Sequence, residues 1–339
     1  MMFHSYQLLF LMILFLSILF QISSSSWFSI WMSMEMNLMT FIPFLSSSEN
    51  QLYNEGSMKY FIIQAFGSVM LLIGWMISSF MIFSSFYFKS MSYVMLLLAL
   101  FLKMGAAPFH FWFPSLVNNL SWFSLFMLMT WQKLSPLIML MYINQWMILI
   151  SLSSGVSALI GGIGGLNQIS LRKIFAYSSI GHIGWLMMCM ILSEIIFMFY
   201  ISFYFFMMML FCLIFYMNFI STLVQFFCYK SFFLEKIIIM ISLFSLGGLP
   251  PLSGFFPKWM LLNELLLMKM WMLSLILLLS SLMNLYYYTR IGYSLMMFSS
   301  MIFNLFLFKP KFLNKVLIYF VLYLMLISMI YIPMGMWLM

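Results

Sequence analysis

Long apolar runs constrain this chain more than any other feature of its sequence. Stretches of about 20 apolar residues follow one another with short interruptions, and a helix of that length crosses the hydrocarbon core of a bilayer. Hydrophobic residues make up 66% of the 339 residues, and charged residues make up only 6%. A soluble protein of this composition could not cover its surface with polar groups. The chain is therefore expected to lie in a membrane.

The spanning segments are expected to be helices. Backbone polar groups in lipid must be satisfied internally, which leaves helices or a closed barrel. Barrel strands alternate apolar and polar residues, whereas these runs are apolar on every side. The sequence predicts an all-α polytopic membrane protein of about eleven transmembrane helices. The expected spans lie near residues 5–21, 26–45, 57–80, 91–107, 120–143, 147–166, 171–191, 195–221, 236–267, 271–296 and 315–335.

The fourth and ninth spans are expected to be discontinuous. The fourth ends in residues 103–114 (KMGAAPFHFWFP), and the ninth contains residues 247–258 (GGLPPLSGFFPK). They lie five crossings apart, so they run in opposite directions through the membrane. Discontinuous helices at corresponding places in two inverted halves indicate an ion site in secondary transporters. Proline kinks with only a packing role are the alternative. The glycine-rich residues 161–165 favour close helix packing.

Basic residues are distributed unequally between the two membrane faces. Loops on the N-terminal side hold Lys59, Arg172, Lys173, Lys230, Lys236, Lys309, Lys311 and Lys315, whereas the other side offers only Lys89 and Lys269. The lack of aspartate and the 41 Met and 41 Phe residues are typical of an AT-rich organellar genome. In the inner membrane of such an organelle, the bias of basic residues places the N-terminus in the matrix and the C-terminus in the intermembrane space. Residues 1–9 lack the pattern of an import sequence, and no cleavage site follows residues 6–20, so an uncleaved first helix is expected.

The charge and the cysteines restrict the possible partners. The net charge of +8 comes largely from the loops and favours phospholipids such as cardiolipin, because no soluble basic face exists to hold a nucleic acid. Cys189, Cys212 and Cys228 lie in or beside apolar segments without paired spacing. Neither a disulfide framework nor a metal site is expected.

Titratable residues inside the expected spans carry the functional signal. They are Glu35, Lys103, Lys133, His182 and Lys258. A mid-helix charge facing lipid costs about 2.5–3.5 kcal/mol, so four such charges would cost roughly 10–14 kcal/mol. These side chains must face protein, water or one another. Clusters of this kind typically mark ion paths or proton relays, although an internal salt bridge with a purely structural role is the alternative.

Lysine is suited to proton transfer inside a membrane. Burial disfavours an ammonium group, and a nearby carboxylate favours it again, so a lysine whose partner can be engaged or released has a switchable proton affinity. Glu35 could hold Lys103 charged in one state and free it in another. Lys133 and His182 would pass the proton on through a hydrated interior, because histidine titrates close to physiological pH.

Seven motifs resemble one family. They are residues 31–43 (WMSMEMNLMTFIP), 59–61 (KYF) with 64–65 (QA), 103–114, 131–136 (WQKLSP), 165–168 (GLNQ) with 171–173 (LRK), 178–185 (SSIGHIGW) and 247–259. Together and in this order, they resemble the subunit 2 family of mitochondrial NADH dehydrogenase, the antiporter-like subunits of respiratory complex I. Beyond residue 260 the likeness is weak.

The resemblance implies a fold for this chain and a distribution of functions among the subunits of the complex. It implies two inverted five-helix repeats, about 1–145 and about 146–297, and a trailing helix at about 315–335. It implies the pumping glutamate at Glu35 and lysines at Lys103, Lys133 and Lys258. NADH, FMN, iron–sulfur clusters and ubiquinone would be bound by other subunits, so no cofactor is expected on this chain. The implied partners are the other membrane-arm subunits of the complex.

Three functions remain open at this point. The first is proton translocation in the mitochondrial inner membrane, driven by NADH oxidation and ubiquinone reduction elsewhere in a translocating NADH:ubiquinone reductase. The second is a stand-alone cation/proton antiporter, which would exchange ions as a purified single chain. The third is a structural membrane scaffold, in which the buried charges only hold helices together through ion pairs.

Overall fold

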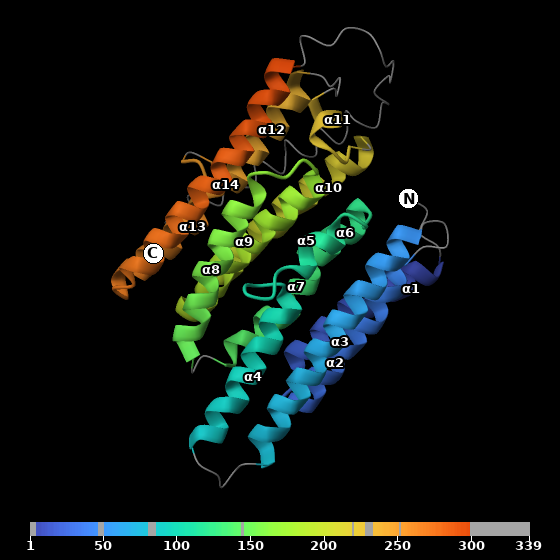
Figure 1. Cartoon of the computed structure of the whole chain (residues 1–339), viewed down its shortest axis with the longest axis vertical. Helices are drawn as coiled ribbons and strands as arrows, with labels where there is room; N and C mark the ends of the chain where they lie inside the picture. Colours follow the sequence, from blue (N-terminus) through green and yellow to red (C-terminus); the bar gives the residue numbers. More distant parts are fainter. Residues whose placement is uncertain are drawn as a thin grey trace. The chain divides into compact units, whose positions relative to one another are not determined.

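The computed structural model describes residues 5–46, 51–80, 86–143, 146–218, 220–227, 233–250 and 252–298. Within these ranges the regular structure is helical, apart from an isolated bridge between Ser170 and Thr222, so the all-α prediction is confirmed. The helices in Figure 1 are α1 (Ser5–Ser23), α2 (Trp27–Leu45), α3 (Gln51–Phe80), α4 (Phe86–Met104), α5 (Trp112–Val117), α6 (Trp122–Met129), α7 (Trp131–Met141), α8 (Met147–Gly165), α9 (Leu171–Leu192), α10 (Glu194–Asn218), α11 (Leu223–Phe227), α12 (Phe233–Gly247), α13 (Phe255–Leu267) and α14 (Trp271–Phe298).

The chain forms two compact units. Unit 1 comprises Met1–Ser157 and unit 2 comprises Ala158–Met339, so the division falls within α8. The sequence places the division near residue 145, and the inverted relation between the two halves stays a prediction. The predicted helix at 315–335 lies outside the described residues.

Many of the helices have the length and composition of membrane spans. Among the described residues, seven helical segments meet both criteria, and shorter apolar helices cover Ser90–Met104 and Lys236–Gly247. Large apolar side chains are exposed along several of these helices, among them Met12, Leu16 and Leu19 on α1 and Leu275, Leu279 and Leu282 on α14. Exposed apolar rows of this extent suit contact with lipid rather than water. These helices make the chain a multi-pass membrane protein.

In unit 1, glycines bring α3 and α4 together. A Cβ atom on Gly74 would lie 3.0 Å from Leu96 Cγ, and one on Gly67 would lie 3.1 Å from Lys103 Cγ. Small residues let helix backbones approach closely, so α4 and the stem of Lys103 pack directly on α3. Helix α2 packs on α1 and α3, while α7 packs on α1, α4 and α6.

In unit 2, α13 packs on α9, α10 and α14, and α14 also packs on α12. The glycine-rich end of α8 packs on α9. A Cβ atom on Gly161 would lie only 2.6 Å from Gly181 Cα, so the two backbones touch. The expectation of close packing for residues 161–165 is confirmed.

The helix interruptions differ partly from those expected. The ninth span is divided into α12 and α13 as predicted, and α4 ends at Met104, three residues before the expected end of the fourth span. The fifth span, predicted as continuous, is interrupted at Thr130 between α6 and α7. Pro136 lies inside α7, six residues after Thr130, so its missing N–H does not explain this interruption. The short helices α5 and α11 have no apolar period long enough to predict.

Helices α4 and α12 end in the same way. After α4, Gly105 N–H donates to Leu102 O at 3.2 Å and Ala106 N–H donates to Phe101 O at 3.0 Å. After α12, Gly248 N–H donates to Ser245 O at 3.1 Å, and Leu249 N–H donates to Phe244 O at 3.2 Å. Both pairs are Schellman caps, whose first residue beyond the helix adopts positive φ and is usually glycine.

Candidate functional site

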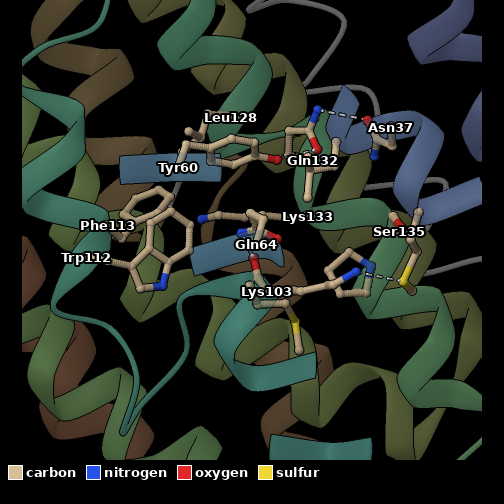
Figure 2. A pocket seen from close by; sticks show the side chains of 14 residues that line it. Asn37, Tyr60, Gln64, Lys103, Trp112, Phe113, Leu128, Gln132, Lys133 and Ser135 are labelled. Atoms are coloured by element: carbon tan, nitrogen blue, oxygen red, sulfur yellow. Dashed lines mark hydrogen bonds between the residues drawn. The ribbon is translucent and has the colours of Figure 1, made fainter. Parts of the chain in front are cut away.

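A cavity of about 20 Å³, lined by polar and apolar side chains, lies inside unit 1 (Figure 2). It has room for about one water molecule. The predicted site residues Lys103 and Lys133 both line it. The other lining residues are Met34, Asn37, Leu38, Tyr60, Gln64, Met104, Trp112, Phe113, Leu128, Gln132, Ser135 and Pro136.

Lys103 lies in the last turn of α4, directly before the cap. Its Nζ atom lies 3.6 Å from Met34 Sδ on α2, and Glu35 is the next residue on that helix. Glu35 is half-buried and is not among the residues that line the cavity. Among the described residues, no ion pair within 4 Å joins the two side chains. The switching role of Glu35 toward Lys103 stays a prediction.

Lys133 is held on α7 and is only 4% exposed. Its Nζ atom lies 4.9 Å from the centre of the Phe113 ring, which belongs to α5 beyond the break after α4. A cation over an aromatic face at this distance is attracted by the ring. The interruption that follows α4 thus supplies an aromatic contact for the lysine of another helix.

A chain of hydrogen bonds joins three helices beside these lysines. Gln132 Nε2 on α7 donates to Asn37 Oδ1 on α2 at 2.9 Å, and Tyr60 Oη on α3 donates to Gln132 Oε1 at 3.2 Å. One of the dashed lines in Figure 2, between Gln132 and Asn37, marks the first of these bonds. Gln132 directly precedes Lys133, so the chain fixes the segment of α7 that carries the lysine.

The carbonyl groups at the end of α4 are also satisfied. Gln64 Nε2 donates to Lys103 O at 3.1 Å, and Trp112 Nε1 donates to Leu102 O at 3.2 Å. Helix ends leave carbonyls without intrahelical partners, and neutral side-chain donors take that place here. Gln64, Trp112 and Gln132 lie in the motifs quoted above, yet their spacing alone assigned them no role.

Unit 2 contains the other two predicted site residues. His182 on α9 is 3% exposed, and its Nδ1 atom lies 2.9 Å from Tyr200 Oη on α10. Lys258 on α13 is 6% exposed and donates to Gly247 O at 2.9 Å and Leu246 O at 3.2 Å. Its Nζ atom also lies 5.7 Å from the centre of the Trp185 ring.

The predicted residues thus fall into two groups. Lys103 and Lys133 line one cavity in unit 1, which also contains Glu35, whereas His182 and Lys258 belong to unit 2. In the part of the chain that the structure describes, no three His, Cys, Asp or Glu side chains gather closely enough to hold a metal ion. Cys189 and Cys212 are buried free thiols, and Cys228 lies outside the described residues.

The broken helices and buried lysines are those of an antiporter-type membrane protein, and the chain belongs to the transmembrane family described as NADH:quinone oxidoreductase/Mrp antiporter, which matches residues 24–284. Within that class its family is that of NADH-ubiquinone oxidoreductase chain 2. It is 39% identical over 292 residues to the Locusta migratoria protein of that name, covering 86% of this chain and 85% of the relative. The Anopheles gambiae protein is 39% identical over 319 residues, covering 91% of this chain and 90% of the relative.

Solved structures show the same fold. A chain of respiratory complex I from Thermus thermophilus superposes with a TM-score of 0.84 at 20% identity, covering 96% of this chain and 78% of that chain. A chain of the Mrp complex from a Dietzia species superposes with a TM-score of 0.73 at 15% identity, covering 89% and 61%. The resemblance drawn from the seven motifs is confirmed.

Proposed function

We propose that this chain is the antiporter-like, proton-translocating membrane subunit of respiratory complex I. In this role it couples NADH oxidation and ubiquinone reduction, which occur in other subunits, to proton transfer across the mitochondrial inner membrane. The assembly is a translocating NADH:ubiquinone reductase, and this chain contributes no redox step of its own. NADH, FMN, the iron–sulfur clusters and ubiquinone belong to the other subunits.

One observation carries this proposal. Two lysines from different helices, Lys103 and Lys133, line one cavity that has room for water, and Glu35 directly follows the methionine that Lys103 contacts. If these lysines had only a structural role, each charge would need a close partner of opposite charge, because an isolated buried charge is costly. Lys103 instead contacts a methionine sulfur, so its hydrogen bonds remain exchangeable. This arrangement suits a group that gains and loses a proton.

Each titratable residue has a role in the proposal. Glu35 modulates the charge of Lys103, and Lys133 exchanges its proton through the water-sized cavity. In unit 2, His182 with Tyr200 and Lys258 at the end of α12 are the transfer groups. The matching caps of α4 and α12 support two inverted repeats, about 1–145 and about 146–297. The basic loops support an N-terminus in the matrix, a C-terminus in the intermembrane space and contact with cardiolipin.

Lys133→Met in the assembled complex tests the function. Methionine fills a similar volume without a titratable group, so we expect the number of protons pumped per NADH oxidised to fall. Lys59→Met is the matched control, because Lys59 is an exposed lysine on α3. If both variants assemble and pump the same number of protons per NADH oxidised, Lys133 is not a transfer group and the proposal fails.

Membership of a complex separates this function from a stand-alone antiporter. The family also includes Mrp antiporter subunits, so exchange by a single chain has to be measured. The native chain should co-purify with NADH-oxidising activity and should not exchange Na⁺ or K⁺ for protons when reconstituted alone into vesicles. Exchange by the reconstituted single chain would overturn the proposal.

A further inference from the structure

The ammonium group of Lys258 is held by a helix end and an aromatic ring. It donates to Gly247 O at 2.9 Å and to Leu246 O at 3.2 Å, and it lies 5.7 Å from the centre of the Trp185 ring. Lys258 is 6% exposed and Trp185 is 1% exposed, so bulk solvent takes little part in this arrangement. Three elements therefore converge on one charge: α12, α9 and α13, which carries the lysine.

The cap of α12 determines which carbonyls the lysine can reach. Phe244 O and Ser245 O accept the capping N–H groups of Gly248 and Leu249. The next two carbonyls, those of Leu246 and Gly247, accept the Lys258 ammonium instead. A cation at the carboxyl end of a helix is stabilised by these free carbonyls and by the helix dipole.

The matching cap of α4 has a neutral partner at the same position. Lys103 O stands in that cap where Leu246 O stands in the cap of α12, and it accepts from the Gln64 amide at 3.1 Å. The charged donor is thus a feature of α12 and not a requirement of this type of helix end.

Gly248 leaves the space that the ammonium fills. A Cβ atom on Gly248 would lie 2.9 Å from Lys258 Nζ and 3.0 Å from its Cδ atom. Any side chain at this position would push the lysine away from the two carbonyls.

Trp185 links this arrangement to the histidine of unit 2. It lies three residues after His182 on α9, so the two side chains share one side of the helix. Its ring stacks on Tyr200 with centroids 6.5 Å apart and planes 16° apart, and Tyr200 Oη lies 2.9 Å from His182 Nδ1. The Trp185 ring therefore lies against both the Lys258 ammonium and Tyr200, which is the hydrogen-bond partner of His182.

We propose that Trp185 is a positioning residue for proton transfer at Lys258. Its ring face holds the ammonium against the Leu246 and Gly247 carbonyls, and its stacking on Tyr200 sets that position relative to the His182–Tyr200 pair. The attraction to the ring requires a positive charge, so the ring holds the protonated lysine and releases the neutral amine. This inference rests on the proposed function, because it assigns Lys258 a proton to transfer.

The experiment compares Trp185→Phe with Trp185→Met in the assembled complex. Both variants leave space in the core, but only phenylalanine keeps an aromatic face. We expect Trp185→Met to lower the pumping rate roughly five- to thirty-fold and Trp185→Phe to recover most of that loss. The apparent KM for ubiquinone should stay unchanged in both, because the quinone is bound by another subunit. Phe175→Met is the packing control, because Phe175 is a buried ring of α9 that contacts Phe211 and Phe215.

The outcomes separate this inference from the proposed function. Equal losses for Trp185→Phe and Trp185→Met, or an equal loss for Phe175→Met, would mean that Trp185 only fills volume, and the inference would be overturned. If Trp185→Met fails to assemble, Trp185→Leu replaces it as the variant without an aromatic face, and the same comparison with Trp185→Phe decides the outcome. Lys258→Met is measured alongside. If it pumps normally, the role of Lys258 in the proposed function is itself wrong.

Discussion

Gly105 and Gly248 occupy the same position in two copies of one helix ending. Each is the first residue after its helix, α4 or α12, and each adopts positive φ, 71° and 84° respectively. In both copies the next residue donates its N–H group to the carbonyl five residues back. Their surroundings differ, because a side chain on Gly105 would meet Phe113 and Trp112, whereas one on Gly248 would meet the Lys258 ammonium.

This difference makes the two glycines a matched pair for mutation. Alanine at either position adopts left-handed backbone at a cost of about 1–2 kcal/mol. We expect Gly105→Ala and Gly248→Ala to lower the thermal inactivation temperature of the complex by similar amounts. The pumping rate should fall further in Gly248→Ala, because only that methyl group displaces Lys258. Equal pumping rates in the two variants would contradict the placement of the ammonium at the end of α12.

Glu35→Gln tests the electrostatic coupling within unit 1. The amide keeps the shape of the side chain and can still form hydrogen bonds, so insertion and assembly should be normal. We expect the pumping rate to fall about tenfold, which corresponds to about 1.4 kcal/mol in the barrier. Glu55→Gln on α3 is the control, because Glu55 is exposed. An unchanged rate in Glu35→Gln would show that its charge does not act on Lys103 during turnover.

Gln132→Leu tests the hydrogen-bonded chain across α2, α3 and α7. Leucine removes the donor to Asn37 and the acceptor for Tyr60, and a buried polar group that loses its partner costs about 1–3 kcal/mol. Tyr60→Phe removes only one of these bonds and should cost about 0.5–1.5 kcal/mol. The thermal inactivation temperature of the complex should follow this order. A reversed order would mean that the chain does not stabilise α7.

Gly161→Ala tests the contact between α8 and α9. The added methyl group would lie 2.6 Å from Gly181 Cα, and a backbone cannot move aside as a flexible side chain can. We expect a destabilisation of about 3 kcal/mol or more and a strong loss of assembled complex. Gly292→Ala is the control, because its nearest neighbour would be the flexible Met240 side chain at 3.3 Å. Equal yields of the two variants would contradict this packing.

Patterns within single segments explain what could be predicted. The fold class follows from apolar length alone, and the break in the ninth span follows from Gly247, Gly248 and Pro250. The predicted site residues stand out in the sequence because each places a charge or an imidazole where lipid would penalise it. None of these inferences needed a neighbouring helix.

Contacts between segments determine the features that the sequence does not predict. The interruption at Thr130 depends on local geometry that has no strong sequence signature, since Pro136 lies six residues further on. The motif spacing assigns no role to Gln132 or Trp185. The partners of Gln132 are Asn37 and Tyr60 on other helices. The partners of Trp185, Tyr200 and Lys258, are also on other helices. Pairing of this kind cannot be read from spacing.

The sequence by itself determined that this chain crosses the membrane as helices and carries titratable groups within them, because the cost of burying polar groups in lipid acts on each segment separately. Only the tertiary structure decided what each of those groups touches. Lys103 and Lys133 line one cavity, and the Lys258 ammonium contacts two carbonyls and a tryptophan ring. These partners are selected by close packing between helices, and that packing depends on where small residues such as Gly67, Gly161 and Gly248 allow backbones and side chains to meet.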